Sequence, residues 1–198
     1  VAIQNSSVAS VAPRDFRLPS FPNPTITADA LLQFGNSNTP GVTTFNVQGP
    51  LPNYSIDPTF PHTIQQSENA TFLFPTTLRA GKIWKVNGFI LAVMKDLAIE
   101  SGATLDATSA GSFGSRVAFR GTTTTQTFRS DVPPSPNQSG GTRQVSLANA
   151  TSNKIRVLEI NNTSGQTPSV TLASPINVTS SLNLVNGSLG GAPGSLLL

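Results

Sequence analysis

Three short stretches of the chain repeat one pattern of apolar and polar positions. They are residues 97–102 (LAIESG), 158–162 (LEINN) and 182–187 (LNLVNG). Apolar residues occupy every second position in each stretch, and each stretch closes on a polar or glycine turn. This alternation predicts short β-strands with one buried face, and no helical periodicity separates them. Short strands joined by tight turns at near-even spacing indicate coils that stack on one another.

The pattern is most regular from Leu78 onward. Turn signals at 79–81, 87–88 and 101–102 separate predicted strands over 82–86, 89–93, 96–99 and 103–107, so that turns recur roughly every seven or eight residues. The same rhythm returns at Val145 and continues to Val185. Three such strands would complete one coil of a triangular solenoid. We therefore expect an all-β fold, a right-handed parallel β-helix (β-solenoid).

Two segments depart from this rhythm. Residues 1–77 hold most of the 16 prolines, which remove ladder donors and favour edges and turns. We expect a Pro-rich irregular N-terminal β segment, or an arm, over 1–77, and the β-solenoid over 78–198. Residues 109–142, rich in glycine, threonine and proline, predict one long loop or hairpin excursion from the stack.

Composition narrows the class of protein. Charged residues make up only 11% of the chain, against the usual quarter, whereas 37% of the residues are hydrophobic, enough for a packed core. The chain has no cysteine, which excludes a disulfide-stapled secreted scaffold and is compatible with a bacterial surface protein. Its net charge of +3 is spread along the sequence, so we expect no nucleic-acid partner. No apolar run approaches the roughly 18–20 residues of a membrane span.

The two ends of the sequence suggest a processed or excised chain. It begins at Val1 rather than at a methionine, and it ends on Leu196, Leu197 and Leu198. A free end of this kind would expose apolar surface, so we expect either a chain cut within a coil or an end that a neighbour covers.

Residues 78–107 and 153–190 resemble the repeats of large surface proteins that the type IX system of Bacteroidota secretes. The resemblance lies in the order of strands and turns: 158–165 (LEINNTSG), 170–178 (VTLASPINV) and 182–187 (LNLVNG). It covers roughly a third to a half of the chain. It implies a right-handed parallel β-helix, export to the cell surface, and an adhesin-like or filament-like role.

The residues that could carry catalysis form no recognisable site. Asp96 and Glu100 flank an apolar pair, so both should point outward about 13 Å apart, wider than the roughly 5–9.5 Å of glycoside-cleaving carboxylates. His62 is the only histidine and lies in a Pro-rich stretch without a nucleophile motif. With no cysteine and no calcium-loop pattern, we expect no catalytic residue, no metal ligand and no cofactor.

Two groups of side chains are candidates for partner contacts. If Ile83 points inward, Trp84 points outward, where it would meet a ligand or partner unless the N-terminal segment covers it. Arg116, Arg120 and Arg129 interleave with Phe113, Phe119 and Phe128. That run could form a stacking surface for sugar rings or single strands, or a β-hairpin with its aromatic residues inward and its arginines outward.

These observations predict an extracellular structural or adhesive protein of a cell surface or filament, a non-catalytic scaffold. Its expected partners are copies of itself or neighbouring repeats, with surface glycans as a further class. Two alternatives stay open: a carbohydrate-binding or carbohydrate-cleaving β-helix, and a viral capsid or fibre protein whose residues 1–77 grip a neighbour.

Overall fold

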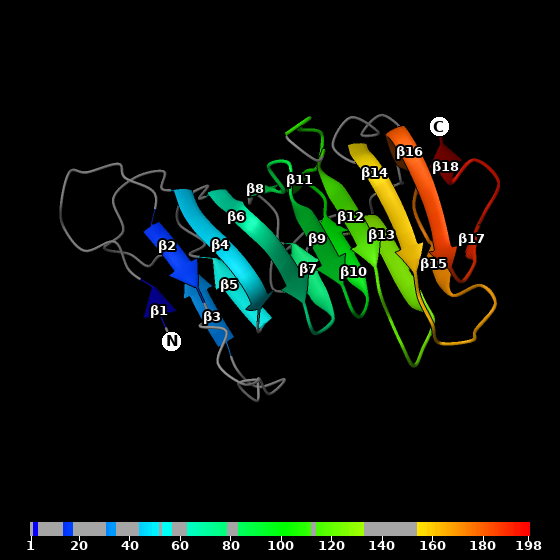
Figure 1. Ribbon diagram of the computed structural model, residues 1–198, viewed down its shortest axis with the longest axis horizontal. Helices are drawn as coiled ribbons and strands as arrows, with labels where there is room; N and C mark the ends of the chain where they lie inside the picture. The colour runs from blue at the N-terminus through cyan, green and yellow to red at the C-terminus, as the bar shows by residue number, and fades with distance from the viewer. Residues whose placement is uncertain are drawn as a thin grey trace, which may run out of the picture.

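The computed structural model describes five N-terminal strands within residues 1–56 and then residues 63–78, 83–111, 114–132 and 154–198. Every regular element in these parts is a β-strand. The strands are β1 (Ala2–Ile3), β2 (Arg14–Arg17), β3 (Leu31–Phe34), β4 (Thr44–Leu51), β5 (Asn53–Ile56), β6 (Thr63–Phe72), β7 (Thr76–Leu78), β8 (Ile83–Lys85), β9 (Ile90–Val93), β10 (Leu97–Glu100), β11 (Thr104–Asp106), β12 (Arg116–Phe119), β13 (Gln126–Val132), β14 (Lys154–Asn161), β15 (Val170–Leu172), β16 (Ile176–Asn186), β17 (Leu189–Gly191) and β18 (Leu196–Leu197). They lie side by side along the long axis, with β1 and β2 at one end and β17 and β18 at the other (Figure 1).

Every strand pair is parallel, and the strands form three faces of a coil. The first face holds the start of β6, then β8 and β11, and later the starts of β14 and β16 and finally β18. The second face holds the end of β6, then β9, β12, β14 and β16. The third face holds β7, β10, β13, β15 and β17. The long strands β6, β14 and β16 each contribute to the first and second faces.

The register shows that two successive coils near the start of the stack and one at its end are nearly equal in length. On the first face Thr63 pairs with Ile83, which pairs in turn with Thr104, so two successive coils take up almost the same length of chain. At the other end of the stack, Ile176 and its partner Leu196 are separated in sequence as Thr63 and Ile83 are. The chain thus winds about five times in the part that the structure describes. The β-solenoid predicted from turn spacing is confirmed.

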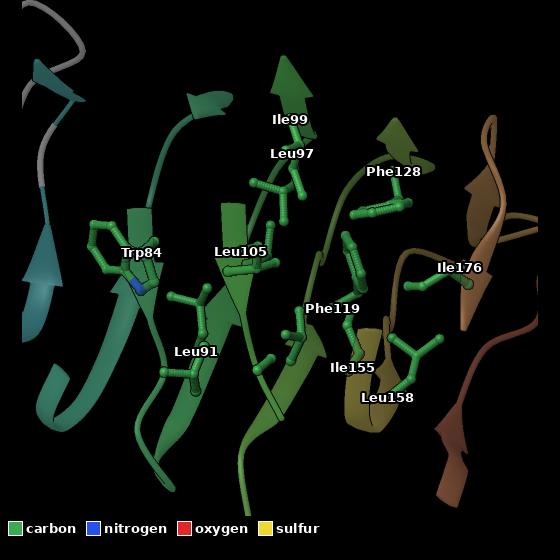
Figure 2. Packing of buried hydrophobic residues seen from close by; sticks show 14 of the residues in the cluster. Trp84, Leu91, Leu97, Ile99, Leu105, Phe119, Phe128, Ile155, Leu158 and Ile176 are labelled. Atoms are coloured by element: carbon green, nitrogen blue, oxygen red, sulfur yellow. The ribbon is translucent and has the colours of Figure 1, made fainter. Parts of the chain in front are cut away.

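Apolar side chains stack in columns inside the coil. On the second face, Leu91, Val117 and Leu158 are in-register partners and are all fully buried. On the third face, Leu97 pairs with Phe128, whose ring meets Phe119 edge-on with centroids 6.3 Å apart. Figure 2 shows the side chains of Leu91, Leu158, Leu97, Phe119 and Phe128 directed into the space between the faces. Each fully buried side chain of this size contributes about 1.5–3 kcal/mol, so every coil adds a similar increment to the core.

Less of the segment 109–142 departs from the stack than the sequence predicts. Within 109–142, β12 and β13 are strands of the stack itself, each held between the coil before it and the coil after it. They do not form a hairpin with one another, because they lie on different faces. The buried side chains of Val117, Phe119 and Phe128 continue the inward columns and so place these strands in the coil. Residues 133–153 lie outside the described residues.

The parallel ladder also extends into the Pro-rich segment. Strand β4 pairs along β6, and β2 pairs with β4 on the other side. Strands β1, β3 and β5 form a second, three-stranded parallel sheet. The parallel sheet of the solenoid therefore continues on the N-terminal side of residue 77, and the strand direction does not change there.

Candidate functional site

Trp84 lies inside the coil, so the expectation that it points outward is wrong. Its side chain is 0% exposed, whereas Ile83 is partly exposed. The in-register partners of Trp84 on the two neighbouring coils are Ile64 and Leu105, both buried. These neighbours therefore determine that Trp84, rather than Ile83, points inward. Figure 2 shows the indole directed into the core. A buried side chain offers no surface to a ligand.

Polar groups inside the coil satisfy the buried indole. The Nε1–H of Trp84 donates to Oε1 of Gln66 at 3.2 Å, and the ring of Phe72 meets the indole edge-on at 4.7 Å between centroids. Gln66 is itself fully buried, and its Nε2 donates to the carbonyl oxygens of Glu68 and Ile90. A buried amide needs such partners, because an unmade hydrogen bond there costs about 1–3 kcal/mol.

Arg116 and Arg120 converge on a single carboxylate, that of Glu159. Nη1 of Arg116 donates to Oε2 at 2.8 Å, and Nη2 and Nε of Arg120 donate to Oε1 at 3.0 and 3.3 Å. The glutamate is only 5% exposed, although its strand position faces outward beside Ala118. The two guanidinium groups, each partly exposed, cover it and link the coil of β12 to the coil of β14.

The structure separates the third arginine from this pair. Arg129 is exposed on the third face, where its in-register partner is Ala98. Phe119 and Phe128 point inward, so neither ring stacks beside an arginine at the surface. Phe113 lies outside the described residues. The described part of the run therefore places its aromatic side chains inward and its arginines outward, but on two faces rather than in one hairpin.

The carboxylates expected on one strand face are divided between surface and interior. Asp96 is exposed, and its Oδ1 accepts a hydrogen bond from the backbone N–H of Thr127 at 2.7 Å. Glu100 is buried at 5% exposure, so the expectation that it faces solvent is wrong. The ladder shifts register between Ala98 and Glu100, which changes the alternation at this point. His62 lies outside the described residues.

A buried polar network that sequence reasoning missed joins four successive coils at one corner. The Nδ2 of Asn162 donates to Oε1 of Gln126 at 3.0 Å and to the carbonyl oxygen of Ser169 at 3.1 Å. Gln126 in turn donates through Nε2 to the carbonyl oxygen of Val93 at 2.7 Å. The hydroxyl of Ser169 donates to the carbonyl oxygen of Ser188 at 2.9 Å. Asn162 follows Asn161 at the end of a strand, the one signal that could have indicated a corner amide.

An open hollow of about 530 Å³ lies at the surface beside this corner. Its lining is neutral and polar: Asn162, Thr163, Gln166, Thr167, Asn186 and Ser188. Asn186 is exposed there and donates through Nδ2 to Oδ1 of Asn161 at 2.7 Å. These groups could hydrogen-bond a neutral polar ligand, but they bring neither charge nor an aromatic ring.

Comparisons with known proteins add no family. No protein-family model matches the chain, and no curated protein or solved structure matches it significantly. Among the described residues, no three histidine, cysteine or acidic side chains are grouped closely enough to hold a metal ion. The described part of the chain also contains no helix with the length and apolarity to cross a bilayer.

Proposed function

We propose that the protein is an extracellular, non-catalytic scaffold that serves a structural or adhesive role on a cell surface or in a filament. The observation that carries this proposal is the uninterrupted parallel ladder, which runs from β4 to β18 around a continuous apolar core. In such a stack each interior strand is hydrogen-bonded on both sides, and stability adds up coil by coil. A stiff rod that presents its corners to solvent suits a protein that spaces or displays groups.

The use made of charged side chains supports a structural role. The carboxylate of Glu159 is held by two arginines, and that of Asp96 fixes a backbone N–H of the next coil. Asp106 accepts hydrogen bonds from the backbone and side chain of Thr108 at the end of its strand. These carboxylates stabilise turns and neighbouring coils, a use that needs no bound substrate.

The expected location and partners rest on composition and on the resemblance to secreted repeat proteins. A low charge content and the absence of cysteine suit a bacterial surface protein that gains rigidity from stacking rather than from disulfides. Copies of the same chain or neighbouring repeats are the partners that a solenoid can accept through its ends.

Surface labelling of intact cells tests the proposal. An antibody raised against the purified chain should label intact cells of the producing organism by immunogold, and external protease should remove the signal. Labelling that requires permeabilised cells would contradict an extracellular role. Negative-stain micrographs of the purified protein should show elongated particles, whereas globular particles would contradict the rod.

A carbohydrate-binding role is the second candidate, favoured by the neutral hollow beside Asn162 and Asn186. A glycan array with the wild-type protein and an Asn186→Ala variant tests it. Binding that this variant weakens would support a glycan site at the hollow, and an array without any signal would contradict it.

A further inference from the structure

We propose that Arg116 and Arg120 form a binding site for the carboxylate groups of an acidic glycan. Surface glycans are one partner class of the proposed cell-surface role, on which this inference rests. The two arginines would select those glycans that carry carboxylates.

The two guanidinium groups offer more hydrogen-bond donors than the carboxylate between them uses. A guanidinium carries five N–H groups. Arg116 donates to Glu159 through Nη1 alone, and Arg120 donates to it through Nε and Nη2. Nη2 of Arg116 and Nη1 of Arg120 donate to no group of the described residues. The two side chains are 31% and 38% exposed, so part of each is open to solvent.

One complete edge of the Arg116 guanidinium has no acceptor. Its Nε is the one buried side-chain nitrogen or oxygen atom of the described residues without a hydrogen-bond partner. Folded proteins leave few such atoms, because an unsatisfied charged donor is costly. Nε and Nη2 form the edge through which an arginine grips a carboxylate with two parallel bonds. Glu159 therefore leaves this edge of Arg116 for a second carboxylate, which the partly exposed side chain would meet by turning outward.

Basic residues outnumber acidic residues around this pair. Strands β9, β12, β14 and β16 contain one acidic residue, Glu159, and the basic residues Arg116, Lys154 and Arg156, and Arg120 directly follows β12. Arg156 packs beside the start of β12, where its Nε lies 3.0 Å from the position that a Cβ at Gly114 would take. This surplus of positive charge attracts an anionic chain, and added salt should weaken the attraction.

The contact with Glu159 indicates the class of anion. The same two arginines already hold one carboxylate at 2.8 and 3.0 Å, and a planar carboxylate matches the guanidinium fork. A uronic acid carries this group on its sugar ring, and a polymer of uronic acids repeats it along the chain. The rings of Phe119 and Phe128 are buried, so they offer no platform on which a sugar ring could stack. Charge, rather than ring stacking, would therefore provide the recognition.

Binding of polygalacturonate and of its methyl ester tests the site, because the ester has the same sugar chain without the charge. By biolayer interferometry at low salt, the wild-type chain should bind polygalacturonate and not the ester. Arg120→Gln should weaken this binding about tenfold by removing one charge-assisted contact. Arg129→Gln removes the same charge from the third face and should bind like the wild type. A wild-type protein that binds neither polymer, or both equally, would overturn the proposal, as would equal losses in the two variants.

Glu159→Gln distinguishes a binding site from an arginine pair with a structural role alone. The substitution removes the internal negative charge, so the folded variant should bind polygalacturonate about fivefold more tightly. Unchanged or weaker binding by a variant with the circular dichroism of the wild type would overturn the proposal.

Asn186→Ala alters the neutral hollow and should leave the affinity for polygalacturonate unchanged. A loss of binding in this variant would place the polymer at the hollow and overturn the assignment to the arginines. Failure of the wild type to bind leaves the surface labelling of intact cells unaffected, so the two proposals fail separately.

Discussion

The indole Nε1–H of Trp84 donates to the side-chain oxygen of Gln66 across two neighbouring coils, at 3.2 Å and wholly out of contact with solvent. The pair shows how this fold uses polar atoms. Side chains that would be costly to bury alone are buried together inside the coil, where they tie one coil to the next.

Because Trp84 is the only tryptophan, its fluorescence reports this contact directly. We expect native protein to emit at short wavelength and to resist quenching by acrylamide, with a red shift on unfolding in urea. Trp84→Ala should lower the free energy of unfolding by about 3–5 kcal/mol through the cavity it creates. Native emission like that of free tryptophan would contradict the buried position.

The buried carboxylate of Glu159 should couple energetically to its two arginines. Glu159→Gln removes the charge and replaces one of the two acceptor oxygens with an NH2 group, so one guanidinium group loses its acceptor, but both groups are partly exposed and can recover water. We therefore expect a loss of about 1–3 kcal/mol in the free energy of unfolding. A double-mutant cycle with Arg120→Gln, measured by urea denaturation, should give a coupling of about 1 kcal/mol. Additive effects of the two substitutions would contradict the pairing.

Two glycines with positive φ provide a matched test of close packing between coils. At Gly88, φ is +85° and an added Cβ would lie 2.9 Å from the Cα of Gly111. At Gly165, φ is +76° but nothing lies within 4 Å of an added Cβ. Gly165→Ala should therefore cost about 1 kcal/mol from the backbone alone, and Gly88→Ala about 1–3 kcal/mol more from the collision. Equal losses in melting experiments would show that the two coils can separate locally.

The buried side-chain amide of Asn162 should contribute more to the free energy of unfolding than the exposed side-chain amide of Asn186. Asn162→Ala would remove the second donor of the Gln126 side-chain oxygen and of the Ser169 carbonyl, which keep the N–H groups of Gly121 and Gln126, and it would also remove the acceptor of the Ser164 N–H. We expect a loss of about 2–4 kcal/mol in the free energy of unfolding. Asn186→Ala removes one hydrogen bond at the surface and should change stability by less than about 0.5 kcal/mol. Similar losses for both would contradict the buried network.

The general fold was predictable because turn spacing and alternation are properties of the local sequence. Strands such as 97–100 and 158–160 have one apolar face and a turn directly after it, and these signals give parallel coils without any long-range information. The strands at 116–119 and 126–132 were obscured, because the threonine- and glycine-rich corner between them has the composition of a protruding loop.

The details of the candidate site depend on residues that are close in space but distant in the sequence, so a local pattern cannot predict them. Ile83 and Trp84 are adjacent and both apolar, so alternation alone leaves the phase of the strand undetermined until Ile64 and Leu105 are aligned with it. The burial of Glu159 follows from Arg116 and Arg120, which lie on the preceding coil and far from it in sequence. No local pattern indicates that pairing.

The in-register stacking of each coil on the one before it has a consequence for how the chain acquires its structure. Each new coil finds its template in the coil just completed, so the solenoid can form vectorially, from the first coil toward the last, as the chain emerges from a ribosome or a translocation pore. The longest step on the second face joins Val117 to Leu158, which are separated by about twice the length of chain between Thr63 and Ile83. Doubling the length of a flexible loop raises the entropic free-energy cost of closing it by only about 0.6 kcal/mol. Growth of the rod should therefore pass this step with little delay.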